Sequence, residues 1–193
     1  MRKITINLAA VAAFCIVVAS PTLVSSSCAT PKTEQEDTTI IREDSGITAL
    51  KYSSPEVPSS IEFCGKVIDL SRFDRHERMD RELLAFTYMH STSLQMLKKA
   101  NRYFPIVEPI LKENGIPDDF KYLMVIESNM NPTARSSAGA AGLWQFMQGT
   151  GRDYGLEVNN NVDERYHIEK ATRAACRYLK DAYAKYKDWV AVA

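Results

Sequence analysis

The chain has 193 residues, of which 45% are hydrophobic and 25% are charged, an ordinary balance for a globular protein with one domain and additional segments. Its 24 Lys and Arg residues are matched by 24 Asp and Glu residues, so the formal net charge is +0. A neutral chain lacks the positive excess that favours binding to nucleic acid or to an anionic membrane surface. Nucleic acid is therefore not expected as a partner.

The N-terminus has the layout of a secretory signal peptide, which we predict to span residues 1–29. Two basic residues precede an apolar run over about residues 6–18, and small and polar residues follow. The run is shorter than a membrane-spanning helix normally requires, so we expect export. Two processing sites fit the segment that follows. One is cleavage after Ala29, and the other is attachment of a lipid at Cys28, which would anchor the chain to a membrane.

Residues 30–60 are rich in Ser, Thr, Pro and charged residues, which is typical of a flexible spacer. The remaining residues, 61–193, are expected to form the folded domain. Within it, Cys64 and Cys176 can form a disulfide in an oxidising compartment. Cys176 also falls on the apolar face of a predicted helix, so a free, buried thiol is expected at least as strongly as the disulfide. The cysteines lack the paired spacing of metal sites, and no metal or other cofactor is predicted.

The folded part is predicted to be helical. A long helical pattern covers residues 75–102, and Pro105 can begin a second helix that Gly115 closes. Pro117 and the two acids after it open a third helix, because proline is tolerated in a first turn and the helix dipole favours acids there. This third helix is expected to end near Asn129.

The C-terminal part continues the helical pattern after a loop. Small and polar residues predict a loop over residues 133–142. Apolar side chains then recur every three or four positions over residues 168–186, which predicts an amphipathic helix. No alternating pattern of useful length indicates a strand, so the expected fold class is all-α.

Glu127 is the main candidate for a chemical role. In the third predicted helix, Phe120, Leu123 and Met124 recur on one apolar face, and Glu127 occupies the next position on that face. Burial and the carbonyls at the helix end both disfavour the ionised form of an acid, so its pKa should be raised. Such a carboxyl can donate a proton near neutral pH. A buried acid in a structural hydrogen-bond network fits the pattern equally well.

The block ESNMNPTARSSAGAAGLWQFM, residues 127–147, carries several motifs in close succession. Glu127 with Ser128, and the run GLWQ at residues 142–145, resemble the first two motifs of the lytic transglycosylases of the soluble lytic transglycosylase fold, in which the second motif usually reads GLMQ. The flanking segments PDDFKYLMVIES and GTGRDYGLEVNNNVDERYHIEK are most similar to the membrane-bound lytic transglycosylase D group of bacteria. The resemblance extends over roughly residues 75–193.

This resemblance implies an all-α, lysozyme-like domain that cleaves the β-1,4 bond between N-acetylmuramic acid and N-acetylglucosamine in peptidoglycan and leaves 1,6-anhydromuramic acid. It further implies that Glu127 acts alone, first as the acid that protonates the glycosidic oxygen and then as the base that deprotonates the C6 hydroxyl. Glycan strands of peptidoglycan would be the partner. The periplasm or cell envelope would be the location.

Four residues match family positions near the glycan: Ser128, Ser136, Gln145 and Met147. Hydroxyl and amide groups can hydrogen-bond the N-acetyl or hydroxyl groups of a sugar, Ser128 can also orient the acid, and Met147 can pack against the ring. Capping of loop and helix ends is the alternative for the polar residues, and a core position is the alternative for Met147. Trp144 can likewise present an aromatic face to a sugar or serve as a core anchor.

A second catalytic carboxylate would favour an ordinary glycosidase, in which two acids share the work. No other acid falls on a clear apolar face. Solvated or structural roles are expected for Asp153, Glu157, Asp163 and Glu164. The isolated histidines, which indicate no metal site, are His76, His90 and His167.

Members of the family carry a third motif, Ala-Tyr-Asn, shortly after the segment that here reads KDWVAVA and ends at Ala193. The tyrosine of that motif helps to fix the acid and to bind the glycan. A chain without it is expected to lack part of the groove. The alternative functions are therefore a non-catalytic module that binds peptidoglycan in the envelope, and an inactive, truncated enzyme.

Overall fold

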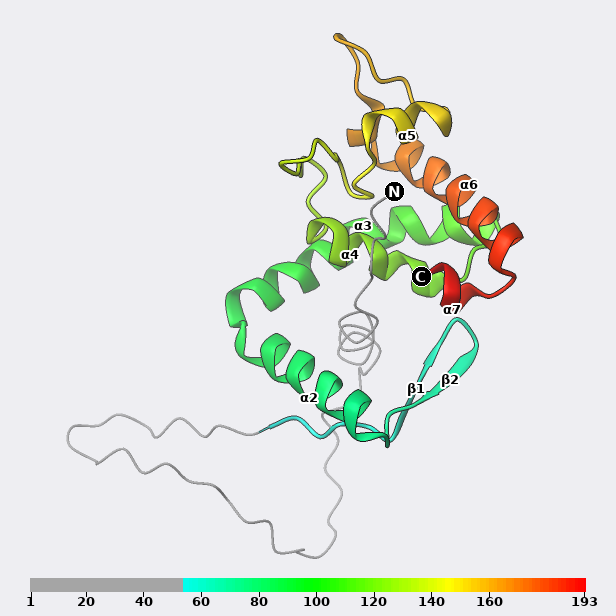
Figure 1. Ribbon diagram of the computed structural model, residues 1–193. Helices are drawn as coiled ribbons and strands as arrows, with labels where there is room; N and C mark the ends of the chain where they lie inside the picture. The colour runs from blue at the N-terminus through cyan, green and yellow to red at the C-terminus, as the bar shows by residue number, and fades with distance from the viewer. Residues whose placement is uncertain (1–53) are drawn as a thin grey trace, which may run out of the picture.

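The computed structural model describes residues 54–193 (Figure 1). The predicted signal peptide, Cys28 and most of the predicted spacer lie outside these residues. A β-hairpin comes first in the described part and helices follow. The elements are β1 (Ser60–Phe63), β2 (Lys66–Asp69), α2 (Phe73–Tyr88), α3 (His90–Glu113), the 3₁₀ helix η1 (Asp118–Tyr122), α4 (Leu123–Ser128), α5 (Gln148–Asp153), the 3₁₀ helix η2 (Glu164–Tyr166), α6 (Ile168–Tyr186) and α7 (Trp189–Val192). This mostly helical architecture confirms the predicted all-α fold class.

The antiparallel hairpin of β1 and β2 is an element that the sequence did not predict. Phe63 pairs with Lys66 next to the turn. The turn residues Cys64 and Gly65 have φ values of 51° and 74°, the left-handed region in which two-residue hairpin turns are built. Each strand has only four residues, so the alternation of apolar and polar side chains is too short to be recognised in the sequence.

The long helical pattern over residues 75–102 belongs to two helices, because α2 ends and α3 begins at Met89, whose ψ of 44° is not helical. The prediction that Pro105 begins a helix is wrong, since Pro105 and Pro109 both lie inside α3. Each proline removes a backbone hydrogen bond of the helix, which destabilises it. Both proline rings lie on the exposed face of α3. Burial of the other face of α3 offsets this cost. Its buried hydrophobic residues are Ala100, Tyr103, Phe104, Val107, Ile110 and Leu111.

The main core lies where α3, η1, α4 and α6 meet. Figure 1 shows α6 beside the C-terminal half of α3, and the two helices are in contact. Met124 of α4 is fully buried in this core. The apolar stripe predicted over residues 168–186 is confirmed, because Ala171, Ala175 and Leu179 of α6 are buried. Small alanines let the helix backbones approach closely.

Cys176 carries a free thiol in this core. Its Sγ atom lies 4.0 Å from the carbonyl oxygen of Ile110 in α3. Burial raises the pKa of the Cys176 thiol to about 11. Of the two states that the sequence left open, the structure has the buried thiol and not a disulfide to Cys64. Such a thiol stays protonated and unreactive near neutral pH.

Aromatic rings attach the hairpin to the helical part. The ring centroid of the buried Phe63 lies 6.4 Å from that of Phe120 in η1, which in turn lies 5.3 Å from the ring of Trp189 in α7. Trp189 also stacks on Tyr183 of α6, with 4.1 Å between centroids. The hairpin, η1, α6 and α7 therefore share one chain of ring contacts.

Polar contacts reinforce the same junction. The backbone N–H of Cys64 donates a hydrogen bond to the Asp119 carboxylate at 2.7 Å. Lys66 forms an ion pair with Asp188 at 2.6 Å, and Figure 1 shows the hairpin tip beside α7. The ion pair is largely exposed and contributes little by itself. Among the helices of residues 54–193, none has the length and hydropathy needed to cross a membrane.

Candidate active site

Glu127 lies one residue before the end of α4, as the sequence predicted. The helix stops because Asn129 and Met130 adopt left-handed φ values of 49° and 52°. The N–H of Asn129 donates to the Val125 carbonyl at 2.8 Å, and the N–H of Met130 donates to the Met124 carbonyl at 3.2 Å. The bond from Asn129 to Val125 is that of an αL C-terminal cap, and the wider bond from Met130 to Met124 encloses it. Asn tolerates the left-handed region, whereas Met130 is held there by complete burial.

The Glu127 side chain is half-buried, and burial raises its pKa, which confirms the predicted direction. Within residues 54–193, the carboxylate has neither a hydrogen-bond partner nor an ion-pair partner. No cation therefore stabilises the ionised form there. A carboxyl in these surroundings retains its proton at a higher pH than an exposed glutamate does.

The Glu127→Gln substitution is therefore expected to stabilise the protein near neutral pH. The raised native pKa means that the native state binds more protons than the unfolded state, so stability falls as the pH rises above the ordinary value of 4.5. We expect a gain of about 0.5–2 kcal/mol at pH 7, the range of single stabilising substitutions.

The gain should disappear below the ordinary pKa, where both states carry the proton. Urea unfolding at several pH values measures this dependence, with Glu62→Gln on the exposed side of β1 as the matched control. A gain for Glu127→Gln that does not vary with pH would contradict the stated cause.

Ser128 joins the end of α4 to the following loop. Its Oγ atom lies 2.9 Å from the Met124 carbonyl oxygen and 3.0 Å from the Leu143 carbonyl oxygen, and these two acceptors share its single hydroxyl proton. The bond to Leu143 links the helix that bears Glu127 to the GLWQ segment. Ser128 therefore fixes the position of the acid relative to that segment, and its predicted contact with the glycan stays a prediction.

The segment between α4 and α5 projects to the left in Figure 1, as a loop with several internal hydrogen bonds. At residues 136–140, the N–H of Ser136 donates to the Ala140 carbonyl at 2.9 Å, and the N–H of Ala140 donates to Ser136 Oγ at 3.0 Å. The Ser136 hydroxyl is thus an acceptor for the backbone and keeps its own proton for another partner. We refer to residues 136–140 as the 136–140 turn.

Gln145 lies on the other side of this loop with a left-handed φ of 47°. Its amide nitrogen donates to the Gly142 carbonyl at 2.8 Å and reaches the Ala134 carbonyl at 3.4 Å. These bonds use the NH₂ group and leave the amide oxygen as an acceptor. Met147 follows with 46% of its surface exposed, so its side chain is accessible to a ligand.

Trp144 has the position of a core anchor. Its indole N–H donates to Thr172 Oγ1 at 3.0 Å. The Thr172 side chain is fully buried, and its hydroxyl donates to the Ile168 carbonyl at 2.7 Å. The side chain of Trp144 thus connects the loop to the first turns of α6.

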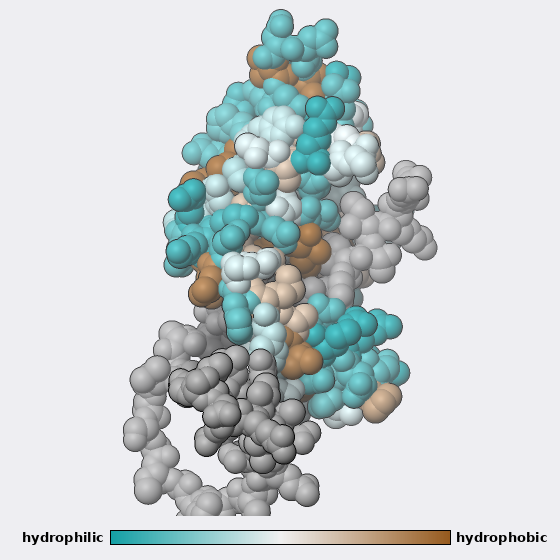
Figure 2. Space-filling model, turned by 90° about the vertical axis from the view of Figure 1, so that its left-hand side faces the viewer, coloured by the Kyte–Doolittle hydropathy of each residue, from teal (hydrophilic) through white to brown (hydrophobic). Residues whose placement is uncertain are grey.

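Figure 2 faces the side toward which the loop projects and shows a mostly hydrophilic surface with small hydrophobic areas between polar ones. Such a surface suits a ligand that is itself rich in hydroxyl and amide groups, with some apolar contact. Among the described residues, no cluster of His, Cys, Asp and Glu could hold a metal ion.

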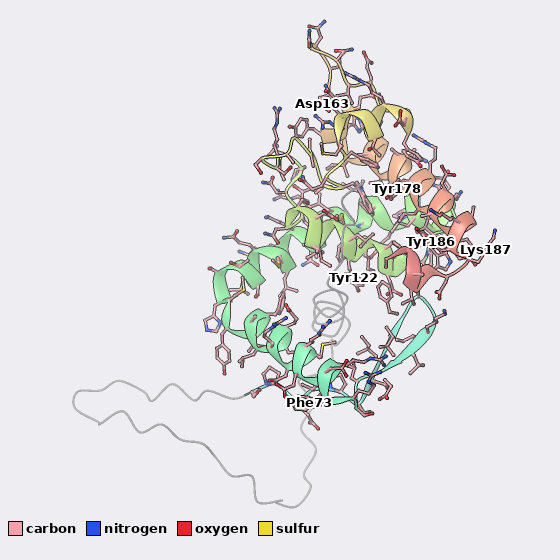
Figure 3. The ribbon with its side chains drawn as sticks, in the orientation of Figure 1. Phe73, Tyr122, Asp163, Tyr178, Tyr186 and Lys187 are labelled. Atoms are coloured by element: carbon pink, nitrogen blue, oxygen red, sulfur yellow. The ribbon has the colours of Figure 1, made fainter. Side chains whose placement is uncertain are left out.

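The other acids that the sequence singled out lie in structural interactions or are exposed. Asp163 pairs with Arg165 at 2.7 Å, and hydrogen bonding to that guanidinium lowers the pKa of Asp163. Glu164 pairs with Lys170, whose hydrogen bond lowers the pKa of Glu164. Figure 3 shows Asp163 at the end of the molecule near α5, far from the hairpin. Groups that are held ionised cannot serve as proton donors at neutral pH.

Arg165 is the residue of this region that the sequence analysis missed. It is 4% exposed, and its guanidinium donates to the backbone carbonyls of Gly139 and Phe146 as well as to Asp163. Arginine is normally exposed, so nothing in its type predicts burial. The spacing of Asp163 and Arg165 could have indicated a local ion pair, but not the bonds to a loop about twenty residues earlier.

Comparisons with known proteins find similarity in the C-terminal part of the chain. Residues 105–193 match the family model of the transglycosylase SLT domain. The membrane-bound lytic murein transglycosylase D of Escherichia coli strain K12 is 32% identical over 104 residues, and the protein of the same name from Escherichia coli O6:H1 shows the same identity. A putative tributyltin chloride resistance protein of Alteromonas sp. strain M-1 is 22% identical over 103 residues.

These matches cover about half of the present chain, 54% for the two transglycosylases and 53% for the Alteromonas protein. The chain spans 22% of the length of the two transglycosylases and 50% of that of the Alteromonas protein. The matched segment contains Glu127, the 136–140 turn, the GLWQ run and α6. The chain is therefore similar to the transglycosylase SLT domain family over residues 105–193, and its structure has the all-α, lysozyme-like fold.

Proposed function

We propose that this chain is a lytic transglycosylase of peptidoglycan, with Glu127 as its single general acid and base. The observation that carries the proposal is the Glu127 carboxyl itself, which is half-buried, has a raised pKa and lacks a partner within residues 54–193. It lies at the end of α4, which Ser128 ties to a loop with unused polar groups. The match of residues 105–193 to the SLT domain family model supports the same reaction class.

The proposed first step breaks the β-1,4 bond between N-acetylmuramic acid and N-acetylglucosamine. The protonated carboxyl of Glu127 donates its proton to the glycosidic oxygen, which leaves with the bonding electron pair. Positive charge develops at C1 of the muramic acid, where the N-acetyl group of the substrate can stabilise it. Removing such a general acid typically costs a factor of roughly 10² to 10⁴ in rate.

In the second step, the Glu127 carboxylate takes the proton of the C6 hydroxyl of the same sugar. The C6 oxygen attacks C1 and closes the 1,6-anhydro ring, so no water is consumed and the carboxyl regains its proton. One acid is enough, because the nucleophile belongs to the substrate and needs no separate base. This fits the remaining acids, of which Asp163 and Glu164 are held ionised.

Three residues of the loop are proposed to hold the glycan. The Ser136 hydroxyl can donate to a sugar acceptor, and the Gln145 amide oxygen can accept from a hydroxyl or N-acetyl N–H. Met147 can cover an apolar face of the ring. Ser128 is proposed to orient Glu127 beside the same sugar through its bond to Leu143.

The glycan strands of peptidoglycan are thus the proposed substrate, and the periplasm or cell envelope is the proposed location. The basic and apolar N-terminal segment supports export, and a lipid on Cys28 would supply an anchor. Both features lie outside the described residues.

The products of purified sacculi test the reaction directly. Incubation with the full chain is expected to release muropeptides that end in 1,6-anhydromuramic acid, identified by mass spectrometry from the loss of one water relative to hydrolytic products. Release of reducing ends instead would make the chain a hydrolase. Binding to sacculi without any release would favour a non-catalytic envelope module.

A further inference from the structure

Arg165 is a buried charge with an unusually complete set of partners. Its Nε and Nη2 atoms donate to the two carboxylate oxygens of Asp163 at 2.9 and 2.7 Å. Its Nη1 atom donates to the carbonyl oxygens of Gly139 at 2.8 Å and Phe146 at 3.0 Å. The flat guanidinium fork can serve both sets of acceptors at once, whereas a lysine ammonium is a single point of charge on a flexible chain.

The two carbonyls belong to the two parts of the loop that carry the proposed glycan contacts. Gly139 lies in the 136–140 turn, which begins at Ser136, and its N–H donates to the Ser136 carbonyl at 3.0 Å. Phe146 stands between Gln145 and Met147. Arg165 therefore fixes the distance between the hydroxyl on one side of the loop and the amide and thioether on the other.

Arg165 is also held firmly from its other sides. Its aliphatic part packs against Gly151 of α5, where an added Cβ would lie 3.3 Å from the Arg165 Cγ. Its backbone carbonyl approaches Gly142 so closely that an added Cβ there would lie 1.9 Å from the oxygen. With Asp163 fixing the plane of the guanidinium, this residue has little freedom to follow a moving loop.

We propose that Arg165 is a positioning residue for glycan binding, which sets the relative placement of Ser136 against Gln145 and Met147 without touching the sugar. This inference rests on the proposed function for the identity of the ligand. Arg165 forms no bond to Glu127, so it acts on substrate placement and not on the proton transfer. A displacement of about 1 Å at a binding group can cost a factor of up to roughly 10².

The test compares Arg165→Lys with the wild type in the full chain. Lysine keeps the charge and cannot bridge both carbonyls while binding Asp163 through two oxygens. On soluble glycan strands we expect KM to rise about 10- to 100-fold, with the pH profile of kcat/KM unchanged. Amide hydrogen exchange should accelerate at residues 136–140 and remain slow in α3 and α6.

Arg152→Lys is the matched control, because Arg152 is an exposed arginine of the neighbouring α5 with a single type of backbone contact, to the Val158 carbonyl at 2.7 Å. It should alter neither KM nor exchange at residues 136–140. Wild-type KM and wild-type exchange in Arg165→Lys would overturn the inference. So would faster exchange throughout the core with an unchanged KM, which is the result of a merely structural role.

Failure of the proposed enzymatic function can be distinguished from failure of the inference about Arg165. If the wild-type chain releases no product, the enzymatic proposal fails, and the same variants are compared by the affinity of the intact chain for soluble glycan strands. A loss of affinity of about 10-fold or more together with faster exchange at residues 136–140 would still support Arg165 as a positioning residue. Unchanged exchange there would refute it.

Discussion

Glu127→Gln is expected to reduce the release of anhydromuropeptides from sacculi by roughly 10²- to 10⁴-fold or more. Glutamine has nearly the same shape, so the packing at the end of α4 should persist, but its amide can neither donate an acidic proton nor accept one. Because the proposed reaction uses this carboxyl in both steps, no second acid can restore either of them. Quantitative mass spectrometry of the released products, under initial-rate conditions, measures the loss.

Two comparisons separate chemistry from folding and binding. Asp153→Asn removes an exposed carboxyl at the end of the nearby α5 and should leave the rate within about two-fold, as expected for a surface change away from the site. Glu127→Gln should still sediment with sacculi and unfold cooperatively. Substantial activity in Glu127→Gln would assign the acid to another residue and would refute the single-carboxyl mechanism.

Gly142→Ala is expected to be the most destabilising single-methyl change in the loop. A Cβ at Gly142 would lie 1.9 Å from the carbonyl oxygen and 2.8 Å from the carbonyl carbon of Arg165, and both are backbone atoms that cannot rotate away. The φ of Gly142 is also +78°, which disfavours alanine. We expect a loss of about 2–5 kcal/mol in the free energy of unfolding, from overpacking and backbone strain together.

Gly139→Ala separates these two causes. Gly139 has a similar φ of +87°, but an added Cβ would meet nothing within 4 Å. Only the cost of a positive φ for alanine applies there, and we expect a loss of about 1–2 kcal/mol in the free energy of unfolding. Urea unfolding followed by circular dichroism measures both variants. Equal losses at Gly139 and Gly142 would show that the close approach of Arg165 costs nothing, contrary to the geometry.

The helix that bears Glu127 could be predicted because its signals are local. The apolar spacing from Phe120 to Met124 predicts Glu127 on the inner face, and Asn129 ends the helix where its type suggests. The predicted start is wrong, because Asp118–Tyr122 form the 3₁₀ helix η1 and α4 begins at Leu123. The direction of the Glu127 pKa shift follows from the same pattern, since burial is its cause. The amphipathic helix α6 was equally readable, because its stripe of small and apolar residues is long.

Features that depend on distant contacts could not be read in the same way. The helix α3 runs through Pro105 because its other face is buried, and only the packed structure reveals how much burial there is. A hairpin with such short strands is marginal by itself, and contacts of Phe63 with Phe120 and of Cys64 with Asp119 attach it to the helices. The role of Arg165 could be recognised only from the structure, in which its guanidinium donates to the Gly139 carbonyl of the loop. The chemical roles of the site residues remain predictions.

The contacts of the hairpin show that the match to the family model and the packed structure begin at different residues. The match to the SLT domain family model begins at residue 105, whereas the ring of Phe63 lies beside that of Phe120, and the Cys64 N–H donates to Asp119. The segment that matches the family model is thus shorter than the segment whose side chains pack together. Substitutions at Phe63 and at Phe120 should therefore be coupled energetically, although the family-model match contains only the second of these residues.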